Sequence, residues 1–106
     1  MEILNDKNYW VNSGSSYLLE LVLPGWMIND IAQSGDNTPA VQEHAKSEVV
    51  QKGFEKYSDK EIRKVYDEVC YVDNNPEATR QEMIEYCLWD ACWSAVDAEK
   101  LEEGEL

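Results

Sequence analysis

The chain has 106 residues, of which 43% are hydrophobic, and its 22 acidic residues outnumber its 9 basic ones to give a formal net charge of −13. This length and composition predict one folded domain over 1–106 and argue against extensive disorder. The negative charge argues against direct binding to nucleic acid or to an anionic membrane surface, because both bind cationic proteins.

The first part of the chain predicts one ambiguous element and one helix. The aromatic stretch Tyr9–Val11, within polar and turn-rich surroundings, predicts a short strand or a cover over the core. Residues 16–23 are mostly apolar, and a run of this length fits a buried strand or a buried helical segment equally well. Residues 24–35 predict a two-turn helix, with Pro24 at its first position and Gly35 at its end.

Two helices are predicted in the middle of the chain. The first covers 38–52, with Thr38 as its cap and Gly53 as its terminator. The second covers 58–72, and the capping box Ser58–Glu61 marks its start.

The last helix is predicted over 76–101, with Asn75 as its cap, and a frayed acidic tail is expected at 102–106. Its two apolar stripes lie on nearly opposite sides, which is typical of a helix buried between neighbours. We therefore predict a mainly α (or α+β) fold with a long buried C-terminal helix, and a short β element near the N-terminus is an open alternative. The first stripe is Ile84, Cys87, Leu88, Ala91, Ala95 and Ala98, and the second is Tyr86, Trp89, Trp93 and Val96.

Residues suited to catalysis or metal binding are few. Cys70, Cys87, Cys92 and the single histidine, His44, lack the short ligand spacing of a zinc site, so we expect reduced, structural thiols. No nucleophile, phosphate-binding or calcium-binding motif occurs, and we expect no enzyme, no metal and no cofactor. The odd cysteine count and the lack of a leader or a long apolar run favour a cytoplasmic protein, in the host cell if the chain is phage-encoded.

The negative charge is concentrated in the second part of the chain. Residues 1–64 carry a net charge of −3, and residues 65–106 carry −10. Carboxylates three to seven residues apart on a helix lie about 5–10 Å apart, which is comparable to phosphate spacing along DNA. We therefore predict a face that contacts a protein partner, consisting of Asp67, Glu68, Glu82, Glu85, Trp89, Asp90, Trp93 and Asp97.

Two functions fit these features. The first is a small acidic inhibitor, of phage or mobile-element origin, that blocks the cationic nucleic-acid-binding groove of a host defence or DNA-processing protein. In size and charge the chain is comparable to small anti-restriction and anti-CRISPR proteins, although it shares no motif with them. The alternative is an acidic interaction module or adaptor that docks through the aromatic helix face. The sequence leaves open whether Trp89 and Trp93 are core or interface, and whether the protein is a monomer or a homodimer.

Overall fold

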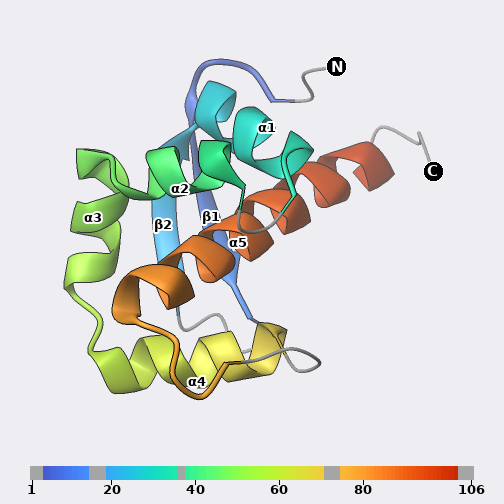
Figure 1. The fold of residues 1–106 in the computed structure, drawn as a ribbon. Helices are drawn as coiled ribbons and strands as arrows, with labels where there is room; N and C mark the ends of the chain where they lie inside the picture. Colours follow the sequence, from blue (N-terminus) through green and yellow to red (C-terminus); the bar gives the residue numbers. More distant parts are fainter. Residues whose placement is uncertain (1–3, 15–18, 36–37, 71–74, 103–106) are drawn as a thin grey trace.

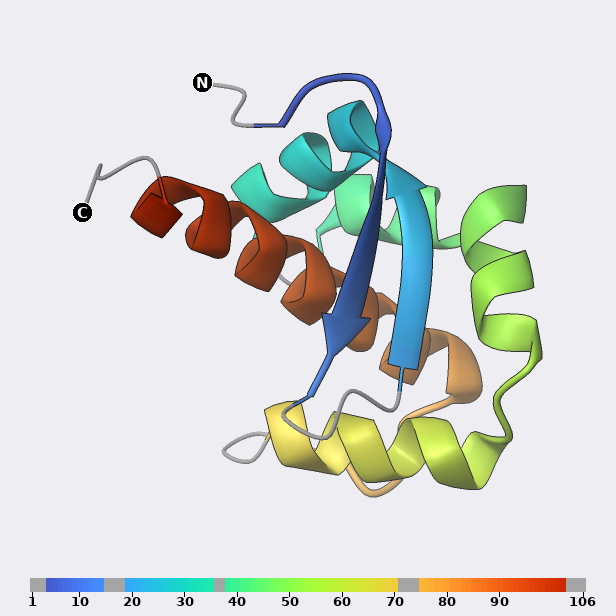
Figure 2. The ribbon, with the colours of Figure 1, turned by 180° about the vertical axis from the view of Figure 1, so that it is seen from behind.

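The computed structural model describes residues 4–14, 19–35, 38–70 and 75–102, with the side chains of 100–102 excepted. It confirms a mainly helical fold with a β element near the N-terminus. Figures 1 and 2 show helix α5 running diagonally across one face of a two-stranded sheet. The elements in chain order are β1 (Asn8–Ser13), β2 (Leu19–Pro24), α1 (Gly25–Gln33), α2 (Pro39–Ala45), α3 (Glu48–Glu55), α4 (Asp59–Val69) and α5 (Arg80–Glu102).

The sheet settles the ambiguity at 16–23 in favour of a strand, since β2 begins at Leu19, while residues 16–18 lie outside the described residues. Strands β1 and β2 are antiparallel, and Val11 is opposite Leu21. Side chains alternate between the two faces of a strand. Leu19, Leu21 and Leu23 accordingly face the core, while the opposite face of the sheet is open to solvent.

The single helix predicted over 38–52 is wrong, because the chain forms two helices separated at Ser47. Ser47 leaves the helical conformation and becomes the N-cap residue of α3. Its hydroxyl donates to the carbonyl oxygen of His44 at 2.6 Å, and the Gln51 side chain donates to that of Ala45 at 2.6 Å. The last carbonyls of α2 are therefore satisfied without a continuous helix. Helix α3 then continues through Gly53, which does not terminate it.

The starts of the last two helices differ in how well the sequence predicts them. The capping box of Ser58 and Glu61 is confirmed, and α4 ends at Val69. Helix α5 begins at Arg80 rather than at Pro76. Its cap is a second reciprocal pair, in which the Glu82 amide donates to the Thr79 hydroxyl at 3.1 Å and the Thr79 amide donates to the Glu82 carboxylate at 2.9 Å.

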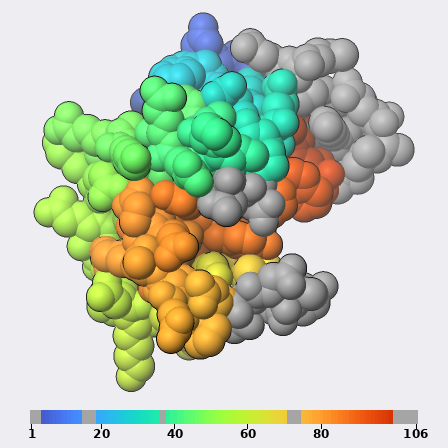
Figure 3. Space-filling view, in the orientation of Figure 1, coloured from blue at the N-terminus to red at the C-terminus, as the bar shows by residue number. Residues whose placement is uncertain are grey.

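Helix α5 is the centre of the packing, as its two-sided apolar pattern predicts. It contacts α1, α2, α4 and β1. Figure 3 shows that the other elements cover much of it, so that it reaches the surface only in patches on this face. Its fully buried side chains include Cys87, Leu88 and Cys92, which pack in one cluster with residues of the sheet and of the other helices.

Candidate protein-binding face of helix α5

The first turn of α5 is fixed to the junction between α3 and α4. The guanidinium of Arg80 donates to the carbonyl oxygens of Phe54 at 3.0 Å and Tyr57 at 2.8 Å, and it also pairs with the carboxylate of Asp59. Carbonyls at a helix end have no partner within the helix, so a cation placed there satisfies them and complements the helix dipole. These contacts of Arg80 fix the position of the start of α5 relative to α3 and α4.

Four aromatic rings form a continuous row that begins at the buried Tyr66 of α4 and continues along α5. We call Tyr66, Tyr86, Trp89 and Trp93 the aromatic row. The ring centroids of Tyr66 and Tyr86 are 5.9 Å apart, and those of Tyr86 and Trp89 are 5.7 Å apart, both edge to face. Trp89 and Trp93 are stacked with centroids 6.3 Å apart and an interplanar angle of 27°. Such pairs favour a fixed ring arrangement.

The two tryptophans of the aromatic row differ in burial, so one belongs to the core packing and the other to the surface. Trp89 is partly buried, and its indole N–H donates to the carbonyl oxygen of Ser34 at 2.9 Å. Trp93 is 48% exposed. Trp89 therefore belongs to the packing against the end of α1, and it supports Trp93 as an exposed aromatic surface.

Two of the predicted carboxylates have structural partners within the protein. Glu82 completes the cap of α5 with Thr79. Asp90 accepts hydrogen bonds from the hydroxyl of Ser13 at 2.9 Å and from the backbone N–H of Gly14 at 3.3 Å, which ties the end of β1 to α5. These two carboxylates stabilise the fold, and replacing either one would disturb structure as well as charge.

Three other predicted carboxylates lie at or near the surface. Asp67 is exposed and lies 3.5 Å from the guanidinium of Arg63. Glu68 is exposed beside Gly14, whose φ of 82° favours glycine and whose Cβ, if it had one, would lie 2.7 Å from the Glu68 carboxylate. Asp97 is partly exposed, one turn of helix beyond Trp93. Because Glu82 and Asp90 have structural roles, fewer carboxylates than the sequence predicts are left to contact a partner.

The prediction that Glu85 belongs to the partner-binding face is wrong, because Glu85 is only 8% exposed. Its carboxylate lies near Lys46 at the end of α2 and near Gln81 on α5. Burial raises the pKa of the Glu85 carboxyl above its usual value, and the nearby charge of Glu82 raises it further. Glu85 is therefore no part of an exposed acidic surface.

We expect the variant Glu85→Gln to be more stable than the parent at neutral pH. A carboxyl whose pKa is raised by folding stabilises the protein when it is protonated, below its unfolded pKa of about 4.3, and that contribution is lost as the pH rises through the folded pKa. The glutamine has no charge to bury. Denaturation midpoints measured against pH should show the advantage of the variant shrinking as the pH falls toward 4. An advantage that does not depend on pH would contradict the assignment.

Two further exposed aromatic residues, Trp10 and Trp26, lie outside the predicted partner-binding face. Trp10 is 61% exposed on the outer face of the sheet, directly opposite Val22, which is 54% exposed. Trp26 lies edge to face on the ring of His44, which in turn pairs with the carboxylate of Asp30. The exposure of Trp10 could be predicted from the alternation of inward and outward side chains in β1, once residues 8–13 are known to form a strand.

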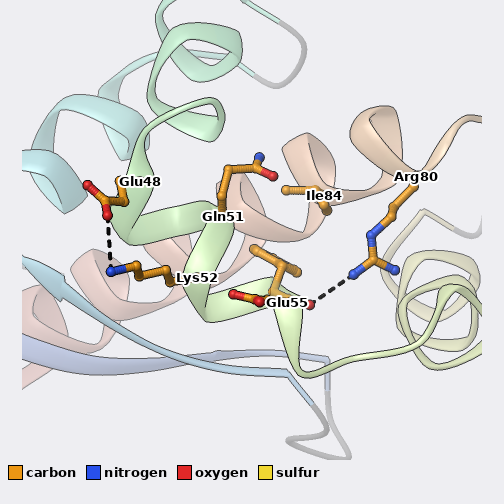
Figure 4. A pocket seen from close by; sticks show the side chains of 7 residues that line it. Glu48, Gln51, Lys52, Glu55, Arg80 and Ile84 are labelled. Atoms are coloured by element: carbon orange, nitrogen blue, oxygen red, sulfur yellow. Dashed lines mark hydrogen bonds and ion pairs between the residues drawn. The ribbon is translucent and has the colours of Figure 1, made fainter.

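A pocket of about 310 Å³ lies between α3 and the start of α5 (Figure 4). Three of its four charged side chains, Glu48, Lys52 and Arg80, already have partners within the protein. Lys52 pairs with Glu48 at 3.0 Å, and Arg80 is held by the backbone carbonyls described above. We therefore assign it no ligand. Its lining consists of Glu48, Gln51, Lys52, Phe54, Glu55, Arg80 and Ile84.

The three cysteines are buried and free. Burial raises the pKa of the Cys87 thiol to about 12, with the charge of Asp90 adding to the effect, and burial also raises the pKa of the Cys92 thiol. Since the thiolate is the reactive form, both groups are poor nucleophiles. Among the described residues, no group of three or more histidine, cysteine or carboxylate side chains is placed to hold a metal ion.

We expect a thiol reagent such as Ellman's reagent to react slowly with the folded protein and rapidly after denaturation, because folding buries all three sulfurs. A chelator should leave the melting temperature unchanged. Rapid labelling of the native protein would place at least one thiol at the surface, and a chelator-dependent fall in melting temperature would reveal a metal site.

None of the helices that the structure describes has both the length and the apolar character of a membrane span. Comparison with protein-family models, curated proteins and solved structures found no match to this chain.

Proposed function

We propose that the protein is a non-catalytic inhibitor that occupies the cationic nucleic-acid-binding groove of a host defence or DNA-processing protein. The observation that carries the proposal is the exposed Trp93, stacked on an anchored Trp89 and next to Asp97 in the most acidic part of the chain. Interfaces bind through a few desolvated anchors, and tryptophan is enriched among them.

Charge supplies the second support. Residues 65–106 carry a net charge of −10, and a field of this sign speeds encounter with a basic surface. Exposed ion pairs contribute little affinity each, typically about 0–1 kcal/mol. A complex of useful affinity therefore needs the aromatic anchor as well as the carboxylates.

The proposal is tested by immobilising the protein, capturing partners from a bacterial lysate, and eluting with a short duplex DNA. A partner held through its nucleic-acid groove should be released by the duplex, because DNA and the inhibitor compete for one site. If nothing that the immobilised protein captures is released by the duplex, the proposal is wrong.

The electrostatic part is tested by a variant that keeps Glu82 and Asp90, which cap α5 and tie β1 to α5. The triple variant Asp67→Asn, Glu68→Gln and Asp97→Asn should fold and associate more slowly with the captured partner, most clearly at low salt. Its matched control changes the net charge equally at exposed sites on α2 and α3, with Glu43→Gln, Glu48→Gln and Glu55→Gln. Equal slowing in both variants would assign the effect to overall charge rather than to this face.

The anchor is tested by Trp93→Ala, which we expect to weaken binding by about 2 kcal/mol or more, the usual size of a hot-spot effect. The melting temperature should change little, because nearly half of the side chain is already in solvent. Unchanged binding to the purified partner, measured by calorimetry, would remove the aromatic row from the interface.

The alternative function is an adaptor that docks through the aromatic row, with charge serving solubility. It is favoured by the structural roles of Glu82 and Asp90, which leave fewer carboxylates for a partner. The two functions differ in their response to salt. Affinity for a cationic groove should fall steeply as the salt concentration rises, whereas an apolar contact should respond weakly. An adaptor's partner would also stay bound in the presence of the duplex.

A further inference from the structure

Strand β1 has a free edge, and its backbone register shows which groups point outward. The amide of Gly25 donates to the carbonyl oxygen of Lys7 at 2.9 Å, one step beyond the pair of Asn8 and Pro24. In an antiparallel pair, hydrogen-bonded and non-hydrogen-bonded positions alternate. The backbone N–H and C=O groups of Asn8, Trp10 and Asn12 therefore point away from β2.

The opposite edge of the sheet is closed. The backbone N–H of Glu20, which points outward from β2, donates to the hydroxyl of Tyr57 at 2.9 Å. Helix α3 packs beside β2 so closely that a Cβ at Gly53 would lie 2.5 Å from a methyl carbon of Leu21. A partner strand therefore cannot pair with β2.

The β1 edge has no such cover over most of its length. Within the described part of the chain, the outward backbone groups of Asn8, Trp10 and Asn12 make no hydrogen bond. The strand contains no charged residue and no proline. Proteins commonly protect an exposed strand edge with such residues, with a bulge or with a covering element, because an open edge is a template for another strand.

At the end of this edge, one outward backbone N–H group already has a hydrogen-bond acceptor on α5. The N–H of Gly14, which directly follows β1, donates to the carboxylate of Asp90 on α5. Asp97 lies two helical turns further along and, at seven residues, on the same side of the helix. Figure 2 shows α5 continuing beyond β1 on the side away from β2. The space beside the β1 edge is therefore next to a helix whose near side is acidic.

We propose that the free edge of β1 binds an extended segment of a protein partner by strand addition, and that this segment alternates apolar residues with lysine or arginine. The residue opposite Trp10 would lie on the outer face of the sheet, where an apolar side chain covers the exposed indole. Its neighbours would point toward α5, where cations meet Asp90 and Asp97. Main-chain hydrogen bonds give affinity in this mode of recognition, and alternate side chains give specificity.

A second copy of this chain fits the edge less well. Two copies related by a two-fold axis would form one continuous sheet with both helix layers on the same side. Because α5 extends past the β1 edge, the two helices would compete for the same space. Each copy also carries a net charge of −13. The inference rests on the proposed function in one respect, since the segment is assigned to the same basic partner.

The test uses a short peptide that alternates valine and lysine, added to the isotopically labelled full chain. We expect the amide signals of Asn8, Trp10 and Asn12 to shift and their hydrogen exchange to slow. A peptide that alternates valine and glutamate should not bind. The segment is expected to add antiparallel to β1. Methylating the valine amides should then abolish binding, because those amides face β1 in that orientation, whereas methylating the lysine amides should leave it intact. Equal binding of the two methylated peptides would overturn the proposal.

A matched pair of protein variants tests the same edge. Asn12→Pro removes a backbone N–H that points outward, and an edge strand tolerates proline at such a position. The variant should therefore fold and should not bind the peptide. Asn12→Ala keeps the donor and should bind as the parent does. If Asn12→Pro does not fold, the methylated peptides decide. Self-association of the parent, with protection of the same amides and no peptide present, would identify a second copy as the occupant and overturn the assignment.

The outcomes separate this inference from the proposed function. Trp93→Ala should leave peptide binding to β1 unchanged, because it removes neither the outward backbone groups of β1 nor the carboxylates of Asp90 and Asp97. The same variant should weaken binding to the captured partner. Loss of peptide binding with DNA-releasable capture retained would refute strand addition alone. Peptide binding without any DNA-releasable partner would refute the inhibitor and leave a strand-binding protein.

Discussion

Replacing Leu88 with alanine is expected to lower the free energy of unfolding by about 2–5 kcal/mol, the usual cost of truncating a core leucine. Leu88 is fully buried on α5, and α5 contacts α1, α2, α4 and β1. The removed methyl groups would leave a cavity that helices packed on several sides cannot easily close. Chemical denaturation followed by circular dichroism measures the effect.

The control is Trp93→Ala, which removes a larger side chain from the exposed side of the same helix. If α5 is the centre of the core, the leucine variant should lose much more stability than the tryptophan variant. A denaturation midpoint that Leu88→Ala does not change would contradict the central position of α5.

Replacing Gly25 with alanine is also expected to destabilise the protein, by an amount at or above the upper end of the usual overpacking range of about 1–3 kcal/mol. A Cβ at this position would lie 1.7 Å from the backbone oxygen of Asn5. The backbone before β1 would have to move, and the hydrogen bond from Gly25 to Lys7 would be strained or lost. The sign is informative, because glycine to alanine within a helix ordinarily stabilises by about 0.5–1 kcal/mol.

Gly35→Ala provides the comparison. A Cβ there would meet only a methyl carbon of Thr38 at 3.6 Å, an ordinary contact. Its thermal unfolding should match that of the parent or be slightly more stable. Equal effects at Gly25 and Gly35 would mean that the segment before β1 does not pack against the start of α1.

The sequence predicts elements best where the signal is local. The capping box at Ser58 and the end of the α1 helix near Gly35 depend on neighbouring residues, and the structure agrees with both. The sequence of residues 19–24 is ambiguous because the strand is defined by its pairing with β1, which its own pattern does not reveal. Two other helix starts also have local signals: a serine stands directly before Glu48, and a threonine stands three residues before Glu82. Other cap and terminator residues nearby favoured different helix bounds.

The functional face was harder to predict, because spacing along a helix does not reveal distant partners. The stripe of Tyr86, Trp89, Trp93 and Val96 divides between an exposed ring and a buried valine. The partner of Asp90 is Ser13, 77 residues away in the sequence. A carboxylate with such a partner looks the same in the sequence as one that is free to bind another protein.

The position of α5 at the end of the described chain has a consequence for protein synthesis. A ribosome makes α5 after every element that packs against it, so a nascent chain that ends at α4 has no central helix. The apolar faces of the sheet and of α1 then stay accessible to chaperones and proteases until α5 leaves the exit tunnel. Folding is therefore expected to wait until α5 has been made, and messages truncated before α5 should yield products that cells degrade rather than accumulate.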